Sequence, residues 1–261
     1  MNANIYPTDL TDTQWGYLQP LLPAPKPRGR KPTDRRRILN ALRYLLRAGC
    51  AWRMLPKDFG PWQTVYHYFR LWIRDGTWAA INEVLRREVR AATGKRAHPT
   101  VAILDSQTVR SADQAGATGY DAAKKTKGVK RHILVDTLGL LLGVCVTPAN
   151  VSERCGARQF LTPALRWWRW LRTLFVDGGY AGADFAQWVA AHRQTGSLQV
   201  QVVPRHQSQN FVVLPKRWIV ERTFGWFRKQ RRLVRHYEVK PDHAEAWLYL
   251  TLIGLMLRRV T

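Results

Sequence analysis

Residues 101–106 are Val-Ala-Ile-Leu-Asp-Ser, and the hydrophobic pattern of the 261-residue chain changes at this stretch. Up to about residue 93, apolar residues recur at the spacing of amphipathic helices, whereas from residue 100 they form short β-branched runs typical of strands. The change predicts two domains, an all-helical one over residues 1–96 and an α/β one over residues 97–261. A chain of this length is long enough to fold as two modest domains.

The second half is expected to form a mixed sheet flanked by helices. Apolar runs predict strands over residues 100–104, 131–137 and 140–147, and Leu138-Gly139 between the last two is a hairpin signal. The pattern continues with a helix at 157–168, a strand at 173–176, a helix at 183–192, a strand at 198–203, and helices at 215–234 and 241–259. This order of elements is that of the RNase H-like fold.

The first half is expected to be a small helical bundle. Its predicted helices span residues 12–22, 34–48, 62–74 and 78–92. A Pro-rich linker at 23–32 carries four basic residues and suits either an arm in a DNA groove or a merely solvated connection. Short helices joined by Gly-containing turns are compatible with a helix-turn-helix DNA reader, although any small helical bundle gives the same pattern.

The net charge of the chain indicates that its binding partner is a polyanion. Forty-two Lys and Arg against 18 Asp and Glu leave a charge of +24, which repels itself unless a polyanion binds. We expect nucleic acid rather than a membrane, because we find no run of about 18 apolar residues and no signal peptide. Three scattered cysteines, without metal-binding or disulfide spacing, suit a reducing cytoplasm, so the expected location is cytoplasmic and nucleoid-associated when DNA is bound.

Two aspartates stand in equivalent places after apolar runs. Asp105 follows residues 101–104, and Asp177 follows residues 174–176 and precedes two glycines. The carboxyl ends of strands in open α/β sheets are where ligands bind, and carboxylate oxygens suit Mg²⁺, for which Mn²⁺ is expected to substitute. The pair therefore indicates a divalent-metal site for phosphodiester chemistry. The alternative is structural, since an aspartate after a strand is a common turn or helix-cap residue.

Glu221 is the third candidate carboxylate. On a helix over residues 216–235 it shares one stripe with Arg217, Arg228 and Arg232. The same geometry places four apolar residues on the core side, namely Val220, Phe224, Phe227 and Val234. One acid within a row of arginines suits a carboxylate on a metal beside DNA phosphates. A salt-bridged solvent face is the commoner source of such a pattern, but it leaves the excess of arginine unexplained.

The densest basic run lies between the predicted strands, and we expect it to contact DNA. It consists of Lys124, Lys125, Lys127, Lys130, Arg131 and His132. The alternative is a charged edge strand that discourages aggregation between sheets. Asp136, at the end of the same segment, is a possible fourth acid but is expected to be structural at the hairpin.

Several motifs together resemble the bacterial DDE transposases of the insertion-sequence-five family. They are residues 103–106 (Ile-Leu-Asp-Ser), 176–180 (Val-Asp-Gly-Gly-Tyr), 217–223 (Arg-Trp-Ile-Val-Glu-Arg-Thr), 127–137, 148–151 and 52–56. The resemblance covers nearly the whole chain and implies Asp105, Asp177 and Glu221 as the catalytic, metal-binding triad, with Arg217 as a helper. It departs from the superfamily pattern at Leu214 and Arg228, where that pattern has Tyr and Lys.

The resemblance implies a metal-dependent enzyme that binds the terminal inverted repeats of its insertion sequence, cleaves there and transfers the strand to target DNA. Pairing two element ends makes a homodimer or larger assembly on double-stranded DNA the expected state. Three alternatives stay open at this point: a metal-dependent nuclease of the same fold, an inactive relic that only binds DNA, and a basic RNA-associated protein.

Overall fold

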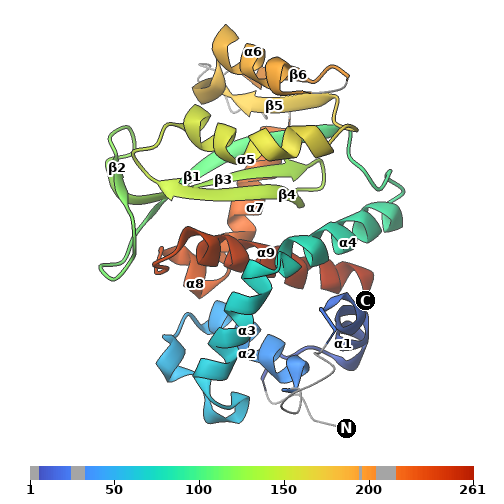
Figure 1. Cartoon of the computed structure of the whole chain (residues 1–261), viewed down its shortest axis with the longest axis vertical. Coiled ribbons are helices and arrows are strands. Elements are labelled where there is room, and N and C mark those ends of the chain that lie inside the picture. The colour runs from blue at the N-terminus through green and yellow to red at the C-terminus, as the bar shows by residue number, and fades with distance from the viewer. Residues whose placement is uncertain (1–5, 25–32, 194–195, 204–215) are drawn as a thin grey trace.

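The structure is a computed structural model, and it describes residues 6–24, 33–193, 196–203 and 216–261 (Figure 1). The basic part of the predicted linker, residues 26–31, and Leu214 lie outside the described residues. The N-terminal part is helical, as predicted. Its elements are α1 (Asp12–Leu18), η1 (Gln19–Leu21), α2 (Arg35–Ala48), η2 (Trp52–Met54), η3 (Lys57–Phe59), α3 (Trp62–Arg74) and α4 (Thr77–Ala92).

Local capping residues explain where the first helices begin and end. Thr11 and Gln14 form a reciprocal capping box at the start of α1. Asp34 accepts hydrogen bonds from two backbone N–H groups in the first turn of α2. The same helix ends at Gly49, which has φ +72°, a left-handed conformation that glycine adopts without steric cost. The predicted span of α2 is therefore confirmed, and the bounds of α3 also agree with the prediction.

The C-terminal part alternates strands and helices. Its elements are β1 (Val101–Arg110), β2 (Gly119–Asp121), β3 (Thr126–Asp136), β4 (Leu141–Pro148), α5 (Glu153–Trp167), β5 (Thr173–Asp177), η4 (Gly178–Tyr180), α6 (Ala183–His192), β6 (Gln199–Val203), α7 (Arg217–Arg228), α8 (Arg231–Val234) and α9 (Pro241–Val260). None of the described helices is both long and apolar enough to cross a membrane.

The strands form one mixed sheet in which β3, β1, β5 and β6 lie side by side in that order, with β4 and the short β2 also pairing with β3. β1 is antiparallel to β3 and parallel to β5. The parallel pair β5–β6 completes the far side of the sheet. A mixed sheet with this order of elements, flanked by helices and preceded by a helical region, confirms the predicted RNase H-like fold.

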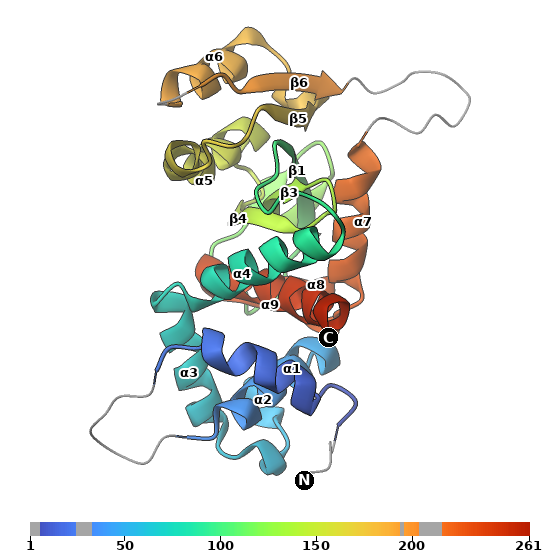
Figure 2. The same ribbon diagram turned by 90° about the vertical axis from the view of Figure 1, so that its right-hand side faces the viewer.

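Helices cover the two faces of the sheet, as Figure 2 shows with α5 on one side and α7 on the other. Side chains alternate along β1, so that Ala102 and Leu104 join the core beneath α5 and α6, while Ile103 joins the core beneath α7 and α9. The same alternation in β5 sends Leu174 and Val176 to the α5 side. Odd-numbered residues of β1 and β5 therefore face α7.

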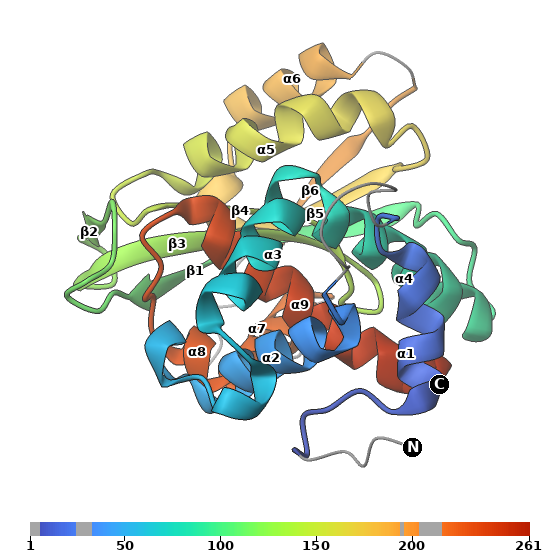
Figure 3. The same cartoon turned by 60° about the horizontal axis from the view of Figure 1, so that its bottom comes forward.

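The N-terminal helices share a hydrophobic core with the C-terminal helix α9. Phe69 of α3 and Trp247 of α9 stack with ring centroids 4.6 Å apart, and Trp78 of α4 belongs to the same buried cluster. Figure 3 shows α1, α2 and α3 gathered around α9. The domain boundary predicted between residues 96 and 97 stays a proposal, and a chain cut there would lose the α9 contacts that the helical part uses.

Several local features differ from the sequence prediction. β3 begins at Thr126 instead of residue 131, and the helix predicted over residues 12–22 is α1 followed by η1. β1 continues to Arg110 instead of ending at residue 104, because its polar second half pairs with β3 as far as Gly128. The helix predicted over residues 215–234 is interrupted between α7 and α8, where Gln230 is extended (φ −101°, ψ 116°). Val234, expected in the core, is consequently 58% exposed. α5 begins at Glu153, four residues before the predicted start at residue 157.

A buried carboxyl group that bonds to the edge strand β4 is expected to make the stability of the fold depend on pH. The Val146 N–H donates to Glu245 of α9 (2.9 Å), and burial raises the pKa of the Glu245 carboxyl to about 7. Because the folded pKa exceeds the unfolded one, this group destabilises the fold progressively as pH rises from about 4.5 to about 7. Glu245→Gln keeps an acceptor without the charge, so its stability advantage is expected to grow from about 1 kcal/mol at pH 5 to about 3 kcal/mol at pH 8.

Thermal or denaturant unfolding of both proteins across this pH range measures the advantage. Asp184→Asn is the matched control, because Asp184 is exposed on α6 and its substitution also removes one negative charge. An advantage of Glu245→Gln that is independent of pH would contradict the assignment.

Candidate active site

Asp105 and Asp177 are brought together by the register of two parallel strands. Ile103 of β1 pairs with Phe175 of β5, so the two aspartates, each two residues further along, occupy equivalent positions. Neighbouring strands lie about 4.8 Å apart, and residues two apart on a strand point to the same face. Both carboxylates therefore belong to the α7 side of the sheet, at the place where the β1–β5 pairing ends.

The electrostatics of this pair are unfavourable in the isolated protein. The pKa of Asp105 is raised to about 7, mainly by burial and next by the neighbouring Asp177 carboxylate. Glu153 adds to this rise, and the Ser106 N–H and Arg217 oppose it. Asp177 is only 9% exposed, and it accepts a hydrogen bond from the Gly179 N–H (3.0 Å). Two buried carboxylates with so little compensating charge form a site suited to a cation.

Arg217 and Glu221 come from α7, which covers this face. Arg217 lines the same small cavity as both aspartates, and its buried Nε has no hydrogen-bond partner among the described residues. Glu221 lies one helical turn further on, with its Oε1 3.5 Å from Arg217 Nε and its side chain 62% exposed. The structure therefore brings Asp105, Asp177 and Arg217 together and leaves Glu221 at the rim.

Glu153 is a nearby acid that the sequence analysis missed. It accepts a hydrogen bond from Ser106 Oγ (2.9 Å) and lies 3.9 Å from Lys124 Nζ. A Cβ at Gly179 would come within 1.9 Å of Glu153 Oε2 and 3.1 Å of Asp177 Oδ1, so glycine at this position permits the two acids to approach. Glu153 begins α5 and reaches the site from the sheet face opposite to α7. An acid in the first turn of a helix is common, so the sequence carried no specific signal for it.

The donor set fits a divalent metal ion that keeps water or substrate ligands. Within the described part of the chain, no three His, Cys, Asp or Glu side chains lie close enough to enclose a metal ion by themselves. Mg²⁺ usually takes one or two carboxylates and completes its shell with water and substrate phosphates, which matches Asp105 and Asp177. The cavity between them and Arg217 has a volume of about 10 Å³, enough for one water-sized sphere.

The nine residues predicted to bind DNA divide into an exposed group and a buried group. The exposed or half-buried ones are Lys124, Lys125, Lys127, Arg217 and Arg228. The three lysines lie at or beside the β2–β3 turn, and Lys125 has φ +48° there. Arg228 ends α7. All five side chains are at least partly exposed to solvent, although Lys124 and Arg217 are each ion-paired with a glutamate.

The buried group makes contacts inside the protein. Lys130 Nζ donates to the Val151 carbonyl (2.9 Å), and Arg131 donates to the Leu233 carbonyl (2.9 Å). His132 is fully buried beside Thr147, and burial lowers its pKa to about 4, so it is uncharged near neutral pH.

Arg232 completes the buried group. It is enclosed between Glu238 and the Cys50 carbonyl. A buried side chain cannot contact a phosphate, and we therefore leave all four out of the DNA surface. β3 is covered on both faces, which the run of basic residues in its sequence did not indicate.

Asp136 is structural, as expected. Its side chain is fully buried and forms a 2.6 Å ion pair with Arg90 of α4. It also accepts hydrogen bonds from the Leu138 and Leu140 N–H groups, both at 2.9 Å. These contacts close the β3–β4 hairpin and attach it to α4, leaving the carboxylate no role in the site.

Comparison with known families gives two matches that together span most of the chain. The family described as "Transposase DDE domain" matches residues 96–257. The family described as "Putative transposase of IS4/5 family" matches residues 10–82. The first match contains every element from β1 to most of α9, including the two aspartates, Arg217 and Glu221.

Curated relatives agree with these families. The chain is 34% identical over 109 residues to the "Insertion element IS402 uncharacterized 16.2 kDa protein" of Burkholderia cepacia, a match covering 39% of this chain and 73% of that protein. It is 29% identical over 130 residues to the "Putative transposase for insertion sequence element IS402" of the same organism, covering 47% of this chain and 60% of that protein. No solved structure matches the chain.

Proposed function

This chain belongs to the family of transposases with a DDE domain, and from that premise we propose that it binds the terminal inverted repeats of its own insertion sequence, cleaves the DNA there and joins the freed strand to target DNA. Two observations support the finer part of the proposal. Asp105 and Asp177 follow the paired residues Ile103 and Phe175 at equivalent positions where the β1–β5 pairing ends. Arg217, whose Nε is ion-paired with Glu221, lines the same cavity as both aspartates.

We assign metal binding to Asp105 and Asp177. Glu221, on α7 at the rim of their cavity, is assigned as the third metal-binding carboxylate. When bound, Mg²⁺ or Mn²⁺ would activate a water or hydroxyl group for attack and neutralise the charge that develops on the oxygens of the attacked phosphate. The raised pKa of Asp105 supports this assignment, because a bound cation would stabilise the charged form of two neighbouring carboxylates that are largely shielded from water.

The remaining side chains orient the DNA. The Arg217 guanidinium is held at the cavity by its ion pair with Glu221 and is placed to donate to the phosphate that is cut. Glu153 fixes Ser106 beside Asp105 through their hydrogen bond. The exposed Lys124, Lys125 and Lys127 supply positive charge along the β2–β3 turn, where a flanking phosphate would be bound with little regard to sequence.

Cleavage and joining are both in-line displacements at phosphorus, so one site is able to perform them in turn. Bringing two element ends together requires two such sites, and we therefore propose that the active assembly on double-stranded DNA is a homodimer or larger. A nuclease of the same fold would need only the first of the two displacements.

The decisive experiment incubates the full chain with a labelled duplex that carries the inverted repeat flanking its gene. We expect nicked ends and joined products with Mg²⁺ or Mn²⁺, no products in EDTA, and no products from a duplex with the repeat scrambled. Cleavage without joining would identify a nuclease instead. Repeat-specific binding without chemistry in either metal, by protein shown to be folded, would identify a relic that only binds DNA.

A further inference from the structure

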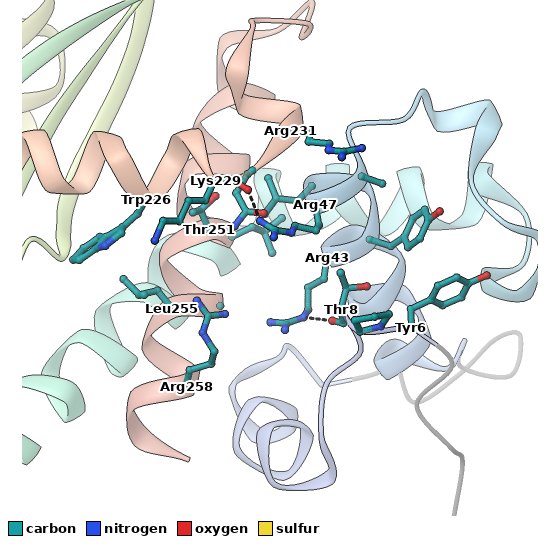
Figure 4. A pocket seen from close by; sticks show the side chains of 17 residues that line it. Tyr6, Thr8, Arg43, Arg47, Trp226, Lys229, Arg231, Thr251, Leu255 and Arg258 are labelled. Carbon is teal, nitrogen blue, oxygen red and sulfur yellow. Dashed lines mark hydrogen bonds between the residues drawn. The ribbon is translucent and has the colours of Figure 1, made fainter.

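A basic cleft lies between the N-terminal helices and the end of α7, far along that helix from the candidate active site. Its volume is about 860 Å³, and one wall comes from α2 and residues 6–8, the other from α9 and residues 226–231. Its charged lining consists of Arg43, Arg47, Lys229, Arg231 and Arg258 (Figure 4). Among the described residues that line it there is no Asp or Glu.

The positive charges in the cleft are poorly compensated. The pKa of Arg43 is lowered to about 10, mainly by burial and next by the neighbouring Arg258, while Asp9 opposes the shift. Asp9 does not line the cleft. Like charges held close together in a partly desolvated cleft destabilise the free protein unless an anion is bound between them. The arrangement therefore favours an anionic ligand.

Two of the guanidinium groups are held in place before any ligand binds. Arg43 Nε donates to the Thr8 carbonyl (2.7 Å), and Arg47 donates to the carbonyl of Lys229 across the cleft. Figure 4 shows these two bonds, with Arg258 on the same side of the cleft as Leu255. A prearranged pair of guanidiniums loses less side-chain entropy on binding, which is an advantage at a phosphate site.

We propose that this cleft binds the sugar–phosphate backbone of duplex DNA as a second, sequence-independent contact, an inference that rests on the proposed function. Five cations spread around about 860 Å³ match several successive phosphates better than one small anion. α7 runs from Arg217 at the active-site cavity to Lys229 just beyond its end, a rise of roughly 18 Å at about 1.5 Å per residue. For a duplex lying along α7, at about 3.4 Å per base pair, the cleft would contact phosphates roughly five base pairs from those at Arg217.

The test is equilibrium binding of the full chain to a duplex of unrelated sequence in EDTA, at several KCl concentrations. The cleft variant is Lys229→Gln, Arg231→Gln and Arg258→Gln combined, which are exposed positions. The logarithm of the DNA-binding constant falls linearly with log salt, and each lost phosphate contact makes this slope shallower by about 0.9. The same loss weakens binding about eightfold at 0.1 M salt. We expect two to three contacts to be lost, and a duplex affinity roughly 50- to 500-fold weaker at that salt concentration.

The control variant combines Arg74→Gln, Arg87→Gln and Arg169→Gln, which removes the same charge from exposed positions away from the cleft. It is expected to keep the wild-type slope and to bind within about threefold of wild type. Equal losses in both variants, or a wild-type slope in the cleft variant, would overturn the proposal. Melting temperatures near wild type establish that the variants are folded.

This experiment separates the cleft from the chemistry. If the wild type cuts and joins element ends while the cleft variant binds duplex normally, the cleft proposal alone fails. If the cleft variant loses its salt-dependent binding while the wild type never cleaves, the cleft proposal stands and the proposed chemistry fails. Titration with inorganic phosphate adds a third arm, since tight phosphate binding together with an unchanged duplex slope would identify a small-anion site instead.

Discussion

Glu221→Gln is expected to slow cleavage of element-end DNA by about 10³-fold, whereas Glu153→Gln slows it by about tenfold or less. Asp105 and Asp177 point to the α7 side of the sheet, and Glu221 approaches from that helix next to Arg217. Loss of one metal-binding carboxylate removes several kcal/mol of charge stabilisation, and about 4 kcal/mol corresponds to 10³ in rate. Glu153 acts from the α5 side on Ser106, and glutamine there retains an acceptor.

Single-turnover cleavage of a labelled end duplex measures the two rates. Thermal stabilisation by Mn²⁺ gives a second readout that does not depend on catalysis, because a ligand of the folded state raises its stability by mass action. We expect the stabilisation to shrink in Glu221→Gln and to persist in Glu153→Gln. A greater loss of both activity and Mn²⁺ stabilisation in Glu153→Gln would assign the third carboxylate to α5 instead of α7.

Local signals account for the part of the fold that the sequence predicted well. α3 and α6 begin and end at the predicted residues because their periodicity and terminators, Pro61 and Asp75-Gly76 for α3, are contained in the segments themselves. The proximity of Asp105 and Asp177 was expected from strand ends. In the structure the two aspartates are close because β1 and β5 are parallel and in register. β1 itself continues past Asp105, and only its pairing with β5 ends, at Ile103 and Phe175.

The sequence pattern did not predict which basic residues are buried, because their burial depends on tertiary packing. The density of basic residues along 124–132 predicted a DNA surface, but β3 becomes a central strand and only the lysines near its turn stay exposed. Extrapolating one helix through residue 234 placed Arg232 on a stripe with Glu221. The break after α7 turns Arg232 inward instead, so its burial depends on partners 6 and 182 residues away in sequence.

Because the Arg232 side chain is buried, Arg232→Ala is the substitution for which we expect the largest loss of stability. Arg232 Nε and Nη2 lie 2.9 and 2.8 Å from Glu238 Oε1, and Nη1 donates to the Cys50 carbonyl (3.0 Å). Its guanidinium carbon also lies 4.8 Å from the Trp247 ring centroid, so it connects α8 to the shared helical core.

Removing Arg232 leaves the buried Glu238 carboxylate without its counter-charge, which costs about 3–5 kcal/mol. For a chain of this size the loss corresponds to a melting temperature lower by roughly 6–20 °C. Arg228→Ala is the matched control, because Arg228 is an exposed arginine of the preceding helix; its effect on stability is expected within about 0.5 kcal/mol. DNA affinity measured where both variants are folded is expected to fall in Arg228→Ala only.

The double variant Arg232→Met, Glu238→Leu separates lost charge pairing from lost packing. Apolar side chains of similar volume often replace a buried ion pair at little cost, so the double variant is expected to regain most of the stability that Arg232→Ala loses. If Arg232→Ala instead melts like the wild type but binds DNA more weakly, Arg232 contacts DNA and the buried ion pair is not its role. Because exposed arginines contribute little to stability and buried ones cannot reach phosphate, the two measurements assign this residue to one function or the other.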